Sequence, residues 1–164
     1  LIDEMDPQQP TAVFLIGDSA GEGMHTLLSE RRTWPGYFKN YVFIGVGVVD
    51  MNSYESDRTL TKMTNKMTKR LKYFVDYSHQ LGVPAISYSA FGTDPVEKLE
   101  ELAGIVQSQF SNPIFFSAKL VMQNEWWLTR LLHNDTPMSL QRRLLLKGMR
   151  LIILPIQLSL KQAK

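Results

Sequence analysis

The stretch Thr11–Gly23, TAVFLIGDSAGEG, decides how this chain is expected to fold. Its apolar run, Ala12–Ile16, shows no alternation of polar and apolar residues, which is typical of a strand buried on both faces. A loop of small and acidic residues follows, and a helical pattern begins at Met24. Because strand and helix patterns continue to alternate after this stretch, we expect Ala12–Ile16 to be the central strand of a parallel sheet.

Four further strand patterns alternate with helical patterns along the chain. Apolar, β-branched runs predict strands at 41–49, 85–91, 113–118 and 151–158. Apolar residues three or four apart predict helices from Met24 to Trp34 and at 58–81, 95–110, 125–132 and 137–147. Pro155 cannot donate to a strand ladder, which places the last strand at a sheet edge. The pattern predicts one doubly wound α/β domain with a parallel five-stranded sheet over 11–160, preceded by a linker at 1–10.

The composition excludes several classes of protein. A formal net charge of +2 over 164 residues is too small for a dedicated DNA-binding protein, and the absence of cysteine excludes disulfides and thiolate chemistry. His25, His79 and His133 have no second ligand at metal-binding spacing, so no metal site is predicted. No apolar run approaches the roughly 20 residues that span a bilayer. Because a natural chain rarely begins with Leu-Ile, we expect this sequence to be a piece of a longer protein.

Candidate binding residues follow two of the predicted strands. Doubly wound sheets bind ligands beyond the carboxyl ends of strands, at the point where strand order reverses. The candidate pocket residues are Asp18, Ser19, Gly21, Lys119, Asn134 and Thr136. The glycine spacing in the first loop, G-x3-G-x-G, matches neither a dinucleotide fingerprint nor a P-loop, and Asp18 and Glu22 would repel phosphate. A tight turn is therefore favoured over a phosphate-binding loop.

The same loop also contains a possible nucleophile. Residues 17–21, GDSAG, satisfy the G-x-S-x-G pattern of a nucleophile elbow and resemble the first block of GDSL-type esterases. Asp94 and His133 follow in the chain order that an elbow enzyme needs, although Asp94 followed by Pro95 is also a helix N-cap pattern. Residues 76–79, DYSH, imitate the D-x-x-H of GDSL enzymes but lie in mid-chain. No oxyanion loop is recognisable, so a serine esterase using Ser19 is an alternative to the noncatalytic function that we favour.

The predicted helix 58–81 has one strongly basic face. Arg58, Lys62, Lys66 and Lys69 lie opposite a stripe of Met, Leu and Phe residues. A solvated face over a buried stripe is the simplest interpretation. The alternative is a surface that contacts anionic lipid head groups or an acidic partner, and no nucleic-acid partner is expected.

The predicted architecture resembles the universal stress protein fold, a Rossmann-like fold. This resemblance implies that the strands, numbered along the chain, lie in the order 3-2-1-4-5. In its nucleotide-binding members, a G-x2-G-x9-G-[ST] phosphate loop follows the fourth strand. Here no glycine occurs from Leu120 to Lys147, and 134–136, NDT, stands roughly where the Gly-Ser pair would be. No cofactor is therefore expected, and a nucleotide-binding stress protein module is kept as an alternative.

Several segments also resemble the C-terminal cytosolic domain of bacterial permeases of the amino acid–polyamine–organocation superfamily. These segments are YFKN at 37–40, GVGVVD at 45–50, FGTD at 91–94, RLLHNDT at 130–136, QRRL at 141–144 and Leu154-Pro155. The likeness runs from about Thr11 to Leu158. It implies a noncatalytic accessory or regulatory domain at the cytoplasmic face of the bacterial inner membrane. Its partners would be the transmembrane part of the same polypeptide and a second copy in a homodimer.

Overall fold

Five parallel strands and three long helices form the described part of the chain. The computed structural model describes residues 4–17, 20–49, 57–118, 142–145 and 147–154. The strands are β1 (Thr11–Ile16), β2 (Asn40–Val48), β3 (Ala85–Gly92), β4 (Pro113–Ala118) and β5 (Leu151–Leu154). The helices are α1 (Ala20–Thr33), α2 (Asp57–Gln80) and α3 (Pro95–Gln109), and residues 142–145 form a further helical turn.

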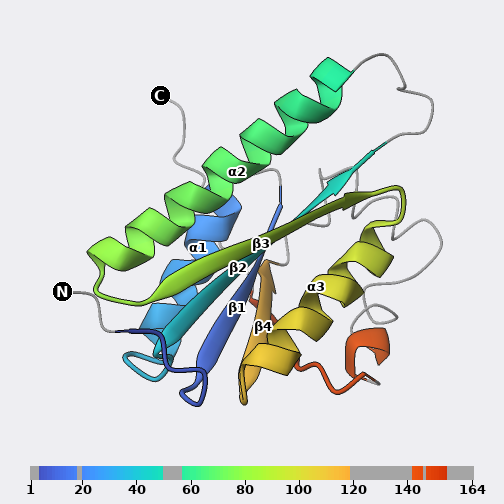
Figure 1. Cartoon of the computed structure of the whole chain (residues 1–164). Coiled ribbons are helices and arrows are strands. Elements are labelled where there is room, and N and C mark those ends of the chain that lie inside the picture. The colour runs from blue at the N-terminus through green and yellow to red at the C-terminus, as the bar shows by residue number, and fades with distance from the viewer. Residues whose placement is uncertain (1–3, 18–19, 50–56, 119–141, 146, 155–164) are drawn as a thin grey trace, which may run out of the picture.

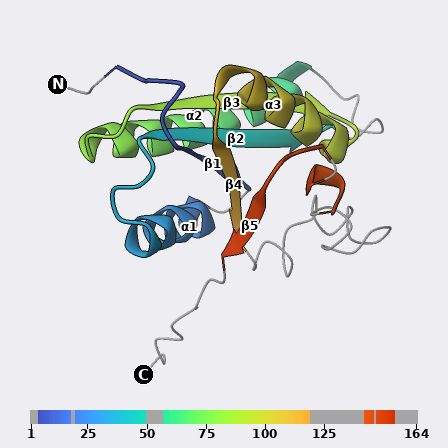
Figure 2. The ribbon, with the colours of Figure 1, turned by 90° about the horizontal axis from the view of Figure 1, so that it is seen from below.

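The sheet has the order β3-β2-β1-β4-β5, with every neighbouring pair parallel. β1 lies in the middle, where Thr11 pairs with Asn40 on one side and with Pro113 on the other. The sheet is strongly twisted, so β2 and β5 cross at a steep angle when the molecule is viewed from below (Figure 2). The predicted fold class, strand order and central position of 12–16 are therefore confirmed.

Helices cover both faces of the sheet (Figure 1). Successive residues of each strand point to opposite faces, so the side chains on both faces of the inner strands pack against helices. Phe14 and Phe43 pack in one core cluster with residues of α1 and α2. Val13 and Val42 pack in a second cluster with residues of α3. The inner strands therefore have no polar face, which explains their continuous apolar sequence.

The core beneath α1 and α2 is rich in aromatic rings. The Phe14 ring stacks against that of Phe43 on β2, with centroids 5.3 Å apart, and against that of Phe116 on β4, with centroids 5.7 Å apart. All three side chains are buried. Stacked pairs of this kind contribute about 0.5 to 1.5 kcal/mol each beyond their buried area, so this row stabilises the centre of the sheet.

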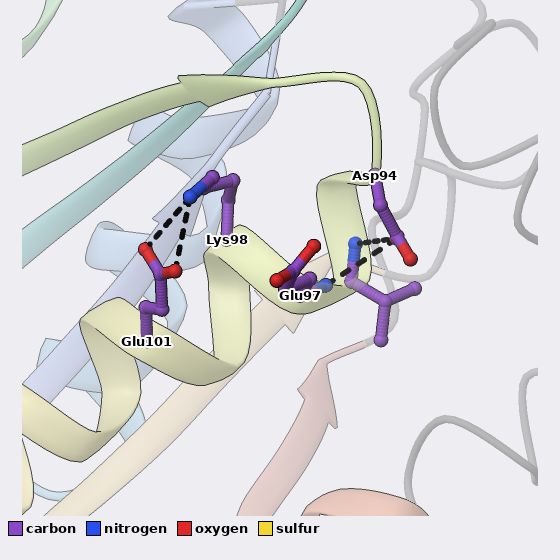
Figure 3. Close-up of polar contacts among 5 residues, drawn as sticks. Asp94, Glu97, Lys98 and Glu101 are labelled. Atoms are coloured by element: carbon purple, nitrogen blue, oxygen red, sulfur yellow. Dashed lines mark hydrogen bonds and ion pairs between the residues drawn. The ribbon is translucent and has the colours of Figure 1, made fainter.

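The third helix begins where the sequence predicts. The Asp94 carboxylate accepts hydrogen bonds from the backbone N–H groups of Val96, at 3.0 Å, and Glu97, at 3.3 Å (Figure 3). Pro95 occupies the first helical turn, where its missing N–H costs nothing. The N-cap prediction is therefore confirmed, and the apolar side of α3 faces the sheet.

Other boundaries differ from the prediction. α1 begins at Ala20 and not at Met24, so residues expected in a loop form its first turn. The apolar stripe of α2 is buried at Met67, Leu71 and Phe74, but Leu60 is 46% exposed because the amino end of α2 stands apart from the strands (Figure 1). Most of the two helices predicted over 125–147, and the end of the last strand with Pro155, lie outside the described residues.

The segment before β1 contacts the rest of the domain. The side-chain amide of Asn40 donates to the backbone oxygen of Asp6 at 2.7 Å, and Ser111 donates its backbone N–H to the oxygen of Pro7 at 3.0 Å. Described residues of this segment thus lie against the amino ends of the strands.

In the part of the chain that the structure describes, no helix is both long and apolar enough to cross a bilayer.

Candidate functional site

The strand order reverses between β1 and β4, so the carboxyl ends of these two strands mark the expected ligand site. Gly21 lies here, exposed in the first turn of α1 and not in a loop as expected. The other candidate pocket residues lie outside the described residues: Asp18, Ser19, Lys119, Asn134 and Thr136. Gly17 ends the described part of the loop after β1.

Gly23 in this region serves helix packing. A Cβ atom at Gly23 would lie 2.6 Å from Cζ of the buried Phe74 ring and 3.0 Å from Cδ1 of Ile16. Gly23 therefore allows α1 to approach α2 and β1 closely. Glu22 in the same turn places a negative charge at the amino end of α1, where the helix dipole favours an anion. The tight turn expected around Gly21 and Gly23 was therefore wrong, because both residues lie in the first turns of α1.

Arg70 brings α2 to the end of the central strand. Its Nη1 atom donates a 2.9 Å hydrogen bond to the backbone oxygen of Gly17, immediately after β1. A charge-assisted bond to a carbonyl that has left the sheet ladder fixes both the loop and the helix at this point. The sequence analysis assigned Arg70 no role at this site, because the two residues lie far apart in the chain.

The carboxyl end of β2 is filled by side chains on the α2 face. A Cβ atom at Gly45 would lie 2.4 Å from Sδ of Met67, and one at Gly47 would lie 2.3 Å from the Phe91 ring. These two glycines therefore make room for apolar side chains. The open part of the switch point is consequently expected between β1 and β4, away from β2.

Three acid and base candidates for Ser19 are engaged elsewhere in the described part of the chain. The carboxylate of Asp94 is engaged in capping α3, and that of Asp76 pairs with Lys72. Nε2 of His79 lies 3.2 Å from the backbone oxygen of Ala85, at the amino end of β3. Ser19 follows the carboxyl end of β1, so this Asp76–His79 pattern lies at the opposite end of the sheet. His133 lies outside the described residues.

A second polar region lies at the amino ends of the strands. The Tyr41 hydroxyl donates to Oε2 of Glu30 at 2.8 Å, and Nη1 of Arg31 lies 3.4 Å from that hydroxyl. Burial raises the pKa of Glu30, and the Tyr41 hydrogen bond and the Arg31 charge offset part of this increase. Burial and the neighbouring Glu30 raise the pKa of Tyr41. The carboxyl–phenol pair therefore holds α1 on β2.

An open cavity of about 530 Å³ adjoins this region. Its lining residues include Asp6, Arg31, Lys39, Tyr41 and Pro84. Lys39 is engaged with the backbone oxygen of Gly36 at 2.7 Å. The cavity lies at the end of the sheet opposite to the switch point, and its acidic and basic side chains balance one another.

Sequence reasoning missed Glu30, although a signal for it exists. The buried face of α1 consists of Gly23, Thr26, Leu27 and Glu30, spaced three or four residues apart. A carboxyl group in such a stripe indicates a buried hydrogen-bonding partner on a neighbouring element.

Among the described residues, no group of three or more potential metal ligands occurs.

Comparison with known proteins supports the fold. Neither the models of known protein families nor the curated protein sequences match this chain. A solved structure from the universal stress protein family of Burkholderia pseudomallei is similar, with a TM-score of 0.61 and 13% identity over 89% of this chain and 96% of that chain. A universal stress protein in complex with cAMP gives a TM-score of 0.51 and 15% identity over 92% and 98% of the two chains. The chain therefore has a universal stress protein-like fold.

Proposed function

We propose that this chain is a noncatalytic binding module whose ligand site lies at the switch point between β1 and β4. The observation that carries the proposal is the topology: the order β3-β2-β1-β4-β5 leaves the carboxyl ends of β1 and β4 beside the amino end of α1. An adenine nucleotide is the first ligand to consider, because a similar fold was solved in complex with cAMP.

The charges at this site favour a ligand with little phosphate charge. Glu22 stands in the first turn of α1, and Asp18 precedes it in the sequence. Two carboxylates near a helix amino end raise the cost of adding a triphosphate, and no glycine is present from Leu120 to Lys147 to form a phosphate loop. We therefore propose cAMP or AMP and not ATP.

Titration calorimetry with cAMP, AMP and ATP tests this proposal. We expect binding to weaken as phosphate charge increases, and Glu22→Gln to improve ATP binding relative to cAMP. Glu101→Gln, at an exposed position of α3, is the matched control and should leave the ratio unchanged. Tighter binding of ATP than of cAMP, or no heat with any of the three ligands, would overturn the proposal.

The noncatalytic part of the proposal has its own test. Asp94 caps a helix and His79 lies at the other end of the sheet, so neither of these two candidates is placed to activate Ser19. We expect no adduct on Ser19 when the folded protein is treated with a fluorophosphonate probe. A Ser19 adduct would favour the esterase alternative.

A second candidate function is a cytosolic accessory domain of an amino acid permease-type transporter. The supporting observation is the resemblance from about Thr11 to Leu158, including YFKN at 37–40 and FGTD at 91–94. This candidate predicts repeated apolar spans of about 20 residues upstream of Leu1 in the full reading frame. It also predicts a homodimer, which light scattering of the purified chain measures. A reading frame without such spans would exclude it.

A further inference from the structure

One side of α2 carries a straight row of basic side chains that ends in a tyrosine. Arg58, Lys62, Lys66, Lys69 and Tyr73 are all exposed, and Tyr73 is 52% exposed. At about 100° per residue, these five positions fall within about 80° of the helix circumference. We call these five residues the basic ridge.

The basic ridge points directly away from the sheet. Met67, Leu71 and Phe74 form the buried side of α2, and their positions lie about 180° from Arg58 on the helix. α2 lies over one face of the sheet, and its amino end stands apart from the strands (Figure 1). The ridge therefore lies on the side of α2 that faces away from the sheet, and all five of its side chains are exposed there.

The positive charge of the basic ridge is not balanced by neighbouring described residues. Arg58, Lys62, Lys66 and Lys69 form no ion pair with any residue that the structure describes. From Arg58 to Gln80 the helix carries one carboxylate, that of Asp76, which is paired with Lys72, and Asp57 precedes Arg58 in the sequence. Four cations over about 16 Å of helix thus form a local positive potential although the whole chain carries only +2.

We propose that the basic ridge docks this domain on a membrane surface that contains anionic lipid. The cations would lie over lipid phosphates, and Tyr73 would place its ring at the level of the head groups, where tyrosine side chains are favoured. A straight ridge on the outside of one helix fits a plane. A nucleic acid is less well matched, because the basic side chains form a single row with one aromatic ring and do not line a groove.

This inference stands independently of the ligand at the switch point. Each cation close to an anionic surface strengthens binding by about fivefold, so four cations together give a strong dependence on lipid charge and on salt. Loss of nucleotide binding would leave the proposal untouched, since the ridge lies on the outer face of α2 and not at the carboxyl ends of β1 and β4.

Sedimentation of the 164-residue chain with vesicles tests the proposal. We expect binding to vesicles of phosphatidylcholine with 30% phosphatidylglycerol, no binding to pure phosphatidylcholine, and release at 0.5 M salt. Replacing both Lys62 and Lys66 by glutamate should weaken binding at least 25-fold, because two contributions of about fivefold are lost. Tyr73→Ala should weaken binding without changing its salt dependence.

A charge-matched variant separates the ridge from net charge. Arg142 and Arg150 are exposed, and the neighbouring Leu144 and Met149 belong to the core cluster on the α3 face. Replacing both arginines by glutamate changes the net charge by the same amount as the ridge variant, yet should leave vesicle binding near that of the wild type. Equal loss in the two variants, equal binding to both vesicle types, or binding of an RNA oligonucleotide in place of vesicles would overturn the proposal.

Discussion

The hydroxyl of Tyr41 on β2 donates a 2.8 Å hydrogen bond to the carboxylate of Glu30 on α1, and both side chains are buried. A buried carboxylate is costly unless it is hydrogen-bonded, so this contact fixes the position of α1 on the sheet. It lies at the amino ends of the strands, away from the proposed ligand site. Its removal should therefore affect stability and not ligand binding.

Tyr41→Phe should lower the free energy of unfolding by about 1 to 3 kcal/mol, because it leaves the Glu30 carboxylate without its donor in a buried position. Urea denaturation measures the change. Tyr37→Phe is the control, since Tyr37 is 50% exposed and should change stability by less than about 0.5 kcal/mol. Equal effects of the two variants would contradict the assigned role of Tyr41.

Glu30→Gln should change how stability depends on pH. The pKa of Glu30 is raised by burial above its ordinary value of 4.5. The unfolded chain therefore ionises first as pH rises, and the wild type loses stability above pH 4.5 until the folded carboxyl group also ionises. The glutamine variant keeps an acceptor for Tyr41 and lacks this loss. Its stability relative to the wild type should rise between pH 4.5 and 7, and a flat difference would contradict the raised pKa.

Gly23→Ala and Gly104→Ala should have opposite effects, although both positions lie inside helices. A Cβ at Gly23 would lie 2.6 Å from the buried Phe74 ring, so we expect a loss of about 1 to 3 kcal/mol. A Cβ at Gly104 meets nothing within 4 Å, so the better helix propensity of alanine should raise stability by up to about 1 kcal/mol. Thermal unfolding distinguishes the two signs, and a gain at both positions would contradict the close approach of α1 to α2.

Asp94→Ala should cost about 0.5 to 2 kcal/mol, because two backbone N–H groups at the start of α3 lose their acceptor. Asp94→Asn should recover most of this loss, since asparagine is an equally good N-cap. Asp76→Ala removes only an exposed ion pair with Lys72 and should cost less than about 0.5 kcal/mol. Circular dichroism during denaturation measures all three variants, and equal losses for Asp94→Ala and Asp76→Ala would argue against capping.

Local sequence predicted the features of the fold that depend on neighbouring residues. The buried run at 12–16 and the cap at Asp94 are both set by residues within one turn or one strand, and both were confirmed. The start of α1 was placed too late, because small and acidic residues before Met24 resemble a loop although they are helical. The exposure of Leu60 was missed, because helical spacing does not reveal where a helix stands apart from the sheet.

The candidate site was less predictable, because its contacts join distant parts of the chain. Arg70 reaches the oxygen of Gly17 from 53 residues away, and Tyr41 reaches Glu30 from the next element. Neither pairing follows from spacing within a helix or a strand. The glycines at 45 and 47 gave a similar difficulty, since only the packed structure reveals that Met67 and Phe91 occupy the space beside them.

The central position of β1 has a consequence for how the chain is made. β1, β2 and β3 are complete once Gly92 has emerged from the ribosome, whereas Pro113, the partner of Thr11 on the other side, is synthesised later. Until β4 is made, the edge of β1 that will pair with β4 has no partner. An unpaired strand edge of this kind is prone to association with other chains. Translation past Ala118 is needed before β4 can pair with that edge. A ribosome stalled between Gly92 and Ala118 should therefore expose an aggregation-prone nascent chain.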